Sequence, residues 1–419
     1  MKPIFLISSP FDTYSGYGAR SRDLIKSIIE TDKYRVKLIS QPWGNTRFGF
    51  CKDNPEWEFL YDLNLSENLT DKPEIWAQIT VPNEFKPMGK FNIGFTAGIE
   101  STLVNGEWVE GMNRMDLNIV SSEHSKQSFL NSTFEKKNQQ GQVLGEIKVI
   151  KPIEVLFEGV NLDTYYPTKE PCLIDFDIKE SFAYLFVGHW LQGELGQDRK
   201  NVGLLVKAFF ETFKNKSKQP ALILKTSGAN SSYMDRNEIL RKINSIKNSC
   251  EGKLPNVYLL HGDFTDKEMN SIYNHSKVKA MISLTKGEGF GRPLLEFTLT
   301  KKPLIATAWS GQMDYLKPEF TTLIGGNLDN VHPSAANHML LKESQWFSPN
   351  HAGISKSLKS VFENYKKHSE LGKRQGHYSK TNFSWDDMKS KLDSILSHNI
   401  PEFPTQIELT IPKLNLPTL

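Results

Sequence analysis

Two glutamates, Glu288 and Glu296, lie eight positions apart in the segment Glu288-Gly-Phe-Gly-Arg-Pro-Leu-Leu-Glu296. The apolar run 280–285 before this segment is typical of a buried strand, and Pro293 suits the first turn of a helix. We therefore expect Glu288 in the loop at the carboxyl end of a strand, and Glu296 about two turns along the next helix. In an open α/β sheet this edge forms the ligand crevice.

The residue types in this segment fit a ligand that carries hydroxyl groups and negative charge. An ionised carboxylate accepts hydrogen bonds through two oxygens and offers no competing donor, which suits pairs of sugar hydroxyls. The backbone N–H groups of Phe290, Gly291 and Arg292 lie at the expected helix start, where they favour sugar oxygens or negative charge. A nucleotide-sugar is the ligand class that fits. The alternative is a pair of solvated surface carboxylates, against which the glycines and the buried strand argue.

Further motifs occur at intervals along the chain. They are Ser15-Gly-Tyr-Gly18, Gly94-Phe-Thr-Ala-Gly-Ile-Glu100, Glu158-Gly-Val-Asn-Leu-Asp163 with Tyr166-Pro167, Phe186-Val-Gly-His189, Arg199-Lys-Asn201 and His261-Gly-Asp-Phe264. Their order resembles that of the retaining glycosyltransferases of family 4, whose two Rossmann-like domains form the GT-B arrangement. The resemblance covers nearly the whole chain. It implies that Glu288 contacts the hydroxyls of the donor sugar and that Glu296 contacts the ribose of the nucleotide.

The charge of a nucleoside diphosphate must be balanced by a metal ion, cationic side chains or helix amides. The resemblance implies that Arg199 and Lys200 contact the diphosphate, and that the backbone at Gly16 and Gly18 faces the phosphates from across the cleft. The alternatives are a basic pair on an exposed loop and a plain turn. The family usually has arginine where His189 stands, so the role of His189 is open.

Two further residues belong to the candidate site. Phe264 follows the strand 257–260, and either lies against the base or packs in the core. Glu100 follows the strand 91–96, and the resemblance implies that it faces the acceptor, where it orients the acceptor or contacts the sugar. Many relatives place a histidine in this region, but His124 is expected to be an ordinary residue of a helix's first turn.

No cofactor is expected beyond the donor substrate, and the predicted site holds no metal ion. Asp175-Phe-Asp177 has the Asp-x-Asp spacing of a metal site, but it lies in the turn-rich stretch 163–179, which we predict to be an interdomain linker. Cys51, Cys172 and Cys250 are far apart and form no zinc or disulfide pattern.

The chain of 419 residues is too long for one typical core, and its net charge of +3 indicates no nucleic-acid or membrane partner by itself. No apolar run reaches the roughly 18 residues of a transmembrane helix, and the cysteine pattern favours a reducing cytoplasm.

Alternating strand and helix patterns, among them strands at 91–96, 221–225 and 257–260 and a helix at 355–368, predict an α/β protein with parallel sheets and crossover helices. The resemblance implies two Rossmann-like domains that face each other across a cleft, the GT-B arrangement. We expect residues 1–165 to form the acceptor-side domain, 166–383 the nucleotide-sugar domain, and 398–419 an irregular tail. The resemblance implies that the helix 384–397 crosses back onto the first domain.

The expected function is transfer of a sugar from a nucleoside diphosphate sugar, such as a UDP-sugar, to a hydroxyl acceptor with retention at the anomeric carbon. The acceptor is left open between a glycan, a lipid-linked saccharide and a hydroxymethylated DNA base, the last being the substrate of some bacteriophage enzymes of similar architecture. Two alternatives stand: a sugar-nucleotide epimerase or hydrolase of the same fold, and a non-catalytic nucleotide-sugar-binding protein.

Overall fold

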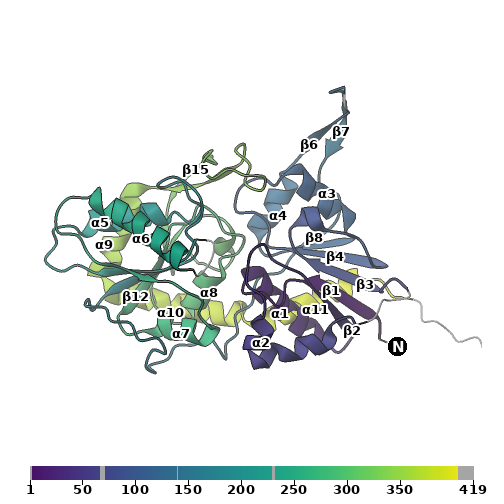
Figure 1. The fold of residues 1–419 in the computed structure, drawn as a ribbon, viewed down its shortest axis with the longest axis horizontal. Coiled ribbons are helices and arrows are strands. Elements are labelled where there is room, and N and C mark those ends of the chain that lie inside the picture. The colour runs from purple at the N-terminus through teal and green to yellow at the C-terminus, as the bar shows by residue number, and fades with distance from the viewer. Residues whose placement is uncertain (1, 67–70, 139, 229–231, 404–419) are drawn as a thin grey trace, which may run out of the picture.

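The computed structural model describes residues 2–66, 71–138, 140–228 and 232–403. It contains two domains, each built on a six-stranded parallel sheet with helices on its faces, and these lie side by side in Figure 1. This confirms the predicted α/β class with two Rossmann-like domains. No helix in the described part of the chain is long and apolar enough to cross a membrane.

The sheet of the amino-terminal domain is parallel throughout. Its four central strands are almost entirely buried, as expected for a sheet covered by helices on both faces. In spatial order the strands are β2 (Arg35–Ser40), β1 (Ile4–Ser9), β3 (Ile75–Ile79), β4 (Phe91–Thr96), β5 (Leu117–Val120) and β8 (Ile153–Val155). The order reverses between β1 and β3, which is the point where open α/β sheets bind ligands.

The three longer helices of this domain begin at polar side-chain caps. Ser15 caps α1 by accepting from the N–H of Gly18, and Ser122 caps α4 by accepting from the N–H of Ser125. The helices are α1 (Gly16–Glu30), α2 (Phe50–Asp53), α3 (Gly106–Arg114) and α4 (Glu123–Leu130), with 3-10 helices at Pro55–Leu63 and Pro82–Glu84.

The carboxyl-terminal domain also has a six-stranded parallel sheet, with apolar strands at its centre. In spatial order the strands are β11 (Val257–Leu260), β10 (Ala221–Lys225), β9 (Ala183–Val187), β12 (Val278–Ser283), β13 (Leu304–Thr307) and β14 (Thr322–Ile324). The helices are α5 (Val202–Phe213), α6 (Tyr233–Asn248), α7 (Asp266–Asn274), α8 (Arg292–Thr298), α9 (His351–Glu363) and α10 (Tyr365–Asn382), with a 3-10 helix at Gly311–Asp314.

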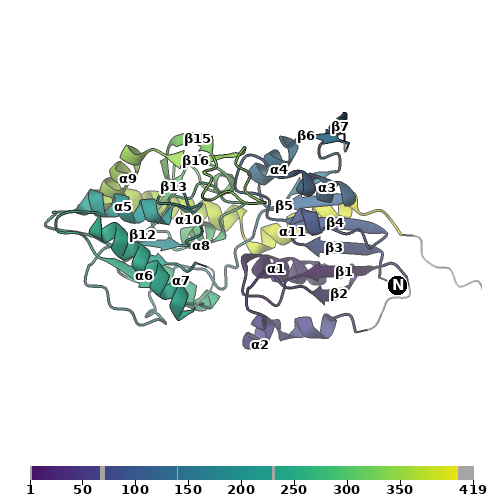
Figure 2. The ribbon, with the colours of Figure 1, turned by 45° about the horizontal axis from the view of Figure 1, so that its top comes forward.

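The last helix, α11 (Trp385–Asn399), returns to the first domain. Met388, Leu392 and Leu396 are fully buried in the apolar core that α1 and the first sheet share. Figure 2 shows α11 beside the strands of the amino-terminal sheet. The expected irregular tail therefore begins after Asn399, and its residues 404–419 lie outside the described residues.

Two hairpins were not predicted from the sequence. The first, β6 (Phe134–Lys137) and β7 (Val143–Ile147), projects from the amino-terminal domain (Figure 1). The second, β15 (Gly326–Asn330) and β16 (Gln345–Pro349), belongs to the other domain, and the connection 331–344 between its strands reaches the first domain. Neither hairpin shows the clean alternation of apolar and polar residues that identifies a strand.

The predicted helix 355–368 is wrong in its extent. The chain forms α9 and α10, separated at Asn364, whose φ of −115° and ψ of 39° interrupt the helical backbone. Gly372 and Gly376 lie within α10, where glycine usually weakens a helix. A Cβ atom at Gly376 would lie 2.5 Å from the carbonyl oxygen of Thr298 in α8, and one at Gly372 would lie 2.7 Å from that of Lys302. These glycines therefore allow α10 to pack closely against α8 and the segment that follows it.

Candidate active site

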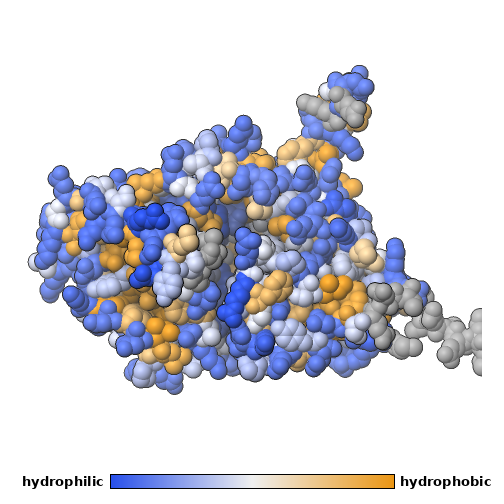
Figure 3. Space-filling view, viewed as in Figure 1, coloured by the Kyte–Doolittle hydropathy of each residue, from blue (hydrophilic) through white to orange (hydrophobic). Residues whose placement is uncertain are grey.

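A cavity of about 900 Å³ lies between the two domains, at the carboxyl ends of both sheets. Figure 3 shows a recess between the domains. Of the predicted site residues, Gly16, Glu100, Arg199, Glu288 and Phe290 line it, and so does Gly291. Gly18, Lys200, Phe264 and Glu296 do not.

Glu288 occupies the loop between β12 and α8, as the sequence predicts. The hydroxyl of Ser310 accepts from its backbone N–H at 2.9 Å. Gly291 ends the loop in the left-handed region at φ 90°, a conformation that favours glycine, and α8 begins at Arg292. The Glu288 carboxylate is therefore fixed at the inner end of the cavity, and only 7% of the residue is exposed.

Two cations hold the Glu288 carboxylate. Lys200 Nζ lies 2.5 Å from Oε1 and Arg199 Nη1 lies 3.5 Å from Oε2. Burial works to raise the pKa of Glu288, but Lys200 and then Arg199 outweigh it, so the pKa is lowered and the carboxylate is ionised at neutral pH. Burial lowers the pKa of Lys200.

Arg199 also joins the two domains. Its Nη1 lies 3.2 Å from Oε1 of Glu100, which comes from the loop after β4, and donates to the carbonyl of Gly287 at 3.0 Å. The structure thus brings together Glu100, Arg199, Lys200 and Glu288, which are far apart in the sequence apart from the neighbours Arg199 and Lys200. Lys200 is not among the residues that line the cavity, but it joins the cluster through its contact with the Glu288 carboxylate.

The facing loops approach each other closely at two glycines. A Cβ atom at Gly287 would lie 1.8 Å from the carbonyl oxygen of Glu100, and one at Gly289 would lie 2.6 Å from the carbonyl oxygen of Ala97. Ser121 Oγ donates to the carbonyl of Gly289 at 3.2 Å. The described conformation therefore has a closed cleft, in which the Glu288 loop touches the amino-terminal domain.

Glu296 lies outside the cavity, about two turns along from the Glu288 loop. Its Oε1 accepts from Arg292 Nε at 3.0 Å, and its Oε2 accepts from the Tyr273 hydroxyl at 3.0 Å. Arg292 also reaches Asp23 of α1 at 2.7 Å, so this ion pair crosses between the domains. Burial raises the pKa of Glu296 to about 7, although Arg292 opposes this shift. Arg292 lines the cavity and holds the Glu296 carboxylate, which does not line it. The ribose contact of Glu296 stays a prediction.

The two glycines predicted to face the phosphates differ in their surroundings. Gly16 lines the cavity and has open space where a side chain would project. Gly18 is buried, and a Cβ atom there would lie 2.4 Å from the carbonyl oxygen of Thr13. The requirement for glycine at Gly18 therefore comes from packing within the loop before α1, and its phosphate contact stays a prediction.

Phe264 also lies off the cavity wall. It is partly buried and packs against the apolar core of its own domain. Lys225 Nζ lies over its ring, 5.5 Å from the ring centroid. This arrangement favours the core-packing alternative, while its neighbour Asp263 lines the cavity.

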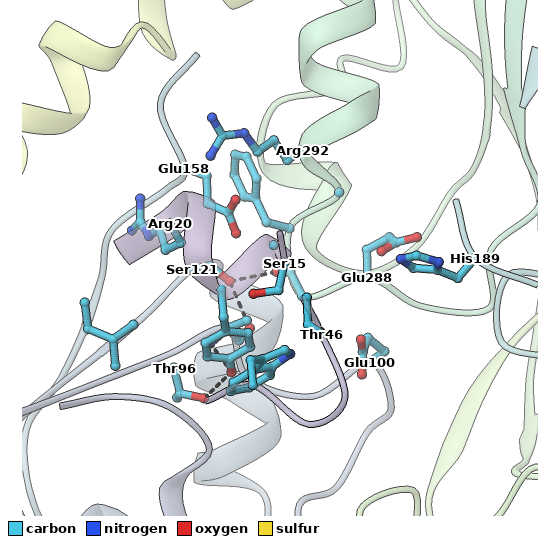
Figure 4. A pocket seen from close by; sticks show the side chains of 18 of the residues that line it. Ser15, Arg20, Thr46, Thr96, Glu100, Ser121, Glu158, His189, Glu288 and Arg292 are labelled. Atoms are coloured by element: carbon cyan, nitrogen blue, oxygen red, sulfur yellow. Dashed lines mark hydrogen bonds between the residues drawn. The ribbon is translucent and has the colours of Figure 1, made fainter. Parts of the chain in front are cut away.

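Several cavity residues were missed or left open by the sequence. Glu158 extends between Arg20 and Arg292 in Figure 4, and burial raises its pKa while Arg20 works against the shift. The sequence signal for Glu158 was its position at the start of the motif 158–163. His189 lies beside Glu288 in Figure 4, with Nδ1 at 3.1 Å from the Ser227 hydroxyl.

Another group of missed residues comes from the loop after β2, which the sequence did not mark. Trp43, Asn45, Thr46 and Arg47 all line the cavity, together with Tyr17 of α1. No motif in the sequence marks this loop. It reaches the cavity only because the folded chain places it at the same sheet edge as Gly16.

The expected linker contains Asp175 and Asp177, and the structure has neither helix nor strand there. Asp177 lies 3.8 Å from Lys277 Nζ and its side chain is 90% exposed. Among the described residues, no group of three or more His, Cys, Asp or Glu side chains is arranged to hold a metal ion.

The sequence matches no protein-family model and no curated protein. Solved structures nevertheless share its fold. A glycosyltransferase from Rickettsia africae is similar at a TM-score of 0.60 and 14% identity, over 95% of this chain and 98% of that chain. Anabaena HepE, solved with UDP and glucose, is similar at 0.57 and 13%, over 94% of this chain and all of the other. Sucrose-phosphate synthase from Thermosynechococcus elongatus is similar at 0.58 and 13%, over 95% and 99%.

At these identities the likeness shows the fold alone. The two domains and the cleft between them have the GT-B arrangement of these proteins.

Proposed function

We propose that this protein is a glycosyltransferase that moves a sugar from a nucleoside diphosphate sugar to a hydroxyl acceptor, with retention at the anomeric carbon. The observation that carries the proposal is the Glu288 carboxylate, held ionised by Arg199 and Lys200 on the wall of a large interdomain cavity. A carboxylate for sugar hydroxyls and two cations for a diphosphate are the groups that such a donor needs side by side.

A UDP-sugar is the first donor to test. HepE, which shares the fold, was solved in complex with UDP-glucose and with UDP and glucose. In this chain the donor's sugar would lie against Glu288 and its diphosphate against Arg199 and Lys200. The N–H groups at the start of α8 would add to the stabilisation of negative charge.

The reaction then follows from position and charge. The acceptor hydroxyl attacks the anomeric carbon on the face from which the diphosphate leaves, and the bond between the anomeric carbon and the phosphate oxygen breaks. The acceptor's proton passes to an oxygen of the departing phosphate. Arg199 and Lys200 stabilise the charge that develops on the diphosphate, and Glu100 orients the acceptor.

Product analysis with purified protein tests this proposal. UDP-glucose is supplied with and without a mixture of hydroxyl acceptors, and both UDP and glucosylated product are measured. We expect UDP release to depend on the acceptor and to fall in Glu288→Gln, but not in the exposed control variant Glu319→Gln.

The alternatives give different results in the same experiment. Equal donor consumption without any acceptor would identify an epimerase or hydrolase. Saturable binding of the donor with no consumption under either condition would identify a non-catalytic binding protein.

A further inference from the structure

Trp43 differs from the other tryptophans of the chain in its surroundings. The sequence has eight tryptophans, and the other seven belong to or pack against apolar core clusters. Trp43 is in none of these clusters among the described residues, and its one aromatic contact is with Tyr17. A large aromatic side chain that is only partly buried, on a cavity wall, lacks the apolar surroundings that normally stabilise it.

The ring of Tyr17 stacks on Trp43 and is held by hydrogen bonds at its hydroxyl. The centroids of Tyr17 and Trp43 lie 3.9 Å apart with the planes inclined by 20°, so the indole lies flat on the phenol. The Tyr17 hydroxyl accepts from the N–H of Ala97 at 3.0 Å and lies 3.1 Å from Thr96 Oγ1. The pair therefore presents a rigid aromatic face to the cavity, at little cost in side-chain entropy on binding.

The loop that carries Trp43 is also held rigidly. The Tyr14 N–H donates to the carbonyl of Arg47 at 3.1 Å, and the Gly49 N–H donates to the carbonyl of Asp12 at 3.0 Å. The Arg47 guanidinium pairs with Asp53 and lies over the Tyr14 ring, at 4.9 Å from its centroid. The aromatic face and its polar neighbours are thus formed before any ligand arrives.

We infer that Trp43 forms the acceptor subsite of the proposed transferase, and that the acceptor is a saccharide whose pyranose ring packs on the indole. This inference rests on the proposed function. A pyranose has an apolar face of C–H groups and a rim of hydroxyls, which match an indole that lines the same cavity as Asn45, Thr46 and Glu100. Figure 4 shows Thr46 between Ser15 and Glu100, on the side of the cavity that faces Glu288.

The charges of the cavity argue against a nucleic-acid acceptor. Four arginines line it, and four carboxylates balance them: Arg20, Arg47, Arg199, Arg292, Glu100, Glu158, Asp263 and Glu288. The donor diphosphate takes up the cationic charge of Arg199, and Arg47 is already paired with Asp53. No cationic excess is left for the phosphates that flank a base in a polynucleotide, whose binding depends on such charge.

The test uses the full chain, with methyl α-glucopyranoside, methyl α-galactopyranoside, methyl α-mannopyranoside and maltose as saccharide probes. Transfer from UDP-glucose to each probe is measured by mass spectrometry, and a hydroxymethylcytosine oligonucleotide serves as the rival acceptor. Tryptophan fluorescence during titration with the same saccharides gives a second readout that requires no donor.

We expect transfer to at least one saccharide, with KM for that saccharide raised roughly five- to fiftyfold in Trp43→Ala and partly restored in Trp43→Phe. The affinity for UDP, measured by calorimetry, should change less than twofold, as should every parameter of the control Trp57→Phe. Saccharide-dependent quenching should disappear in Trp43→Phe and persist in Trp57→Phe.

Transfer to the oligonucleotide but to no saccharide would overturn the inference, and so would saccharide transfer with an unchanged KM in Trp43→Ala. The absence of both transfer and quenching with all four saccharides would also overturn it. If the protein binds no UDP-sugar and yet the saccharides quench Trp43, the proposed function fails while the saccharide subsite stands.

Discussion

Glu288 is buried between Arg199 and Lys200, and this placement separates its effect on catalysis from its effect on nucleotide binding. Arg199 also contacts Glu100 and the carbonyl of Gly287, so it keeps these partners when the Glu288 carboxylate is removed. Without Glu288, one anion fewer competes with a diphosphate for Arg199 and Lys200.

Glu288→Gln should therefore lower kcat with UDP-glucose by about ten- to several-hundredfold, because a contact with the reacting sugar is lost. The affinity for UDP alone, measured by calorimetry, should stay the same or increase. Glu319→Gln, a change of an exposed carboxylate, is the matched control. If the affinity for UDP falls as much as kcat does, Glu288 contacts the nucleotide and the assignment to the sugar is wrong.

Glu296, unlike Glu288, is predicted to affect binding of the nucleotide. Its carboxylate accepts hydrogen bonds from Arg292 and Tyr273. Loss of a charge-assisted hydrogen bond to the ribose costs about 1.5–3 kcal/mol. Glu296→Ala should therefore weaken UDP binding roughly ten- to hundredfold in calorimetry.

Tyr273→Phe is the control for this prediction, since it removes a partner of the same carboxylate without altering the charge. Its UDP affinity should match that of the unmodified protein. An unchanged affinity in Glu296→Ala would show that Glu296 acts only through its interdomain pair with Arg292.

At the scale of elements, the loops at the carboxyl ends of the strands provide the residues of the site. An aromatic contact across the domain boundary also joins two of the elements that follow these strands. His124, in the first turn of α4, packs edge-on against Trp309 of the other domain, at 4.6 Å between ring centroids. Burial lowers the pKa of His124 to about 4, although a hydrogen bond with the backbone of Ile99 opposes this.

This shift predicts a pH-dependent stability. Between about pH 6.5 and pH 4 the unfolded chain binds a proton at His124 and the folded chain does not, so stability is lost as the pH falls, by up to roughly 3 kcal/mol. His124→Phe keeps the ring contact but does not titrate. The loss in urea-unfolding midpoint between pH 7 and pH 4.5 should therefore be smaller in this variant.

The exposed histidine of α9 provides the control, and His351→Phe should lose as much stability as the unmodified protein. An identical loss in His124→Phe would show that this imidazole does not remain neutral in the folded state.

The sequence predicted elements best where the local pattern decides the structure. The strands 91–96, 221–225 and 257–260 were predicted at their observed bounds. The first two are almost entirely buried, because a central strand of a parallel sheet is covered on both faces, and this gives the apolar run that identifies them. The break at Asn364 was missed, since it depends on how α9 and α10 pack on the second sheet. The loop around Trp43 was missed for the same kind of reason, because its place at the cavity depends on contacts with residues 12–17.

Across the whole molecule, the ion pairs and close loop contacts between the domains enclose a cavity whose cationic groups come from side chains. Excess EDTA should consequently leave sugar transfer from UDP-glucose unchanged, because Arg199 and Lys200 balance the phosphate charge. Initial rates with and without EDTA, and after addition of Mg²⁺ or Mn²⁺, check this. A loss of activity that either metal restores would return attention to Asp175 and Asp177.

Calorimetric titration with UDP-glucose tests most directly whether the cleft is a nucleotide-sugar site. We predict saturable binding at one site, with a Kd of roughly 1 µM to 1 mM. Lys200→Met should weaken this binding about tenfold or more, while Lys207→Met, which alters an exposed lysine of α5, should not. No binding of UDP-glucose or of any GDP-, ADP- or TDP-sugar, or equal binding by both variants and the unmodified protein, would contradict the account.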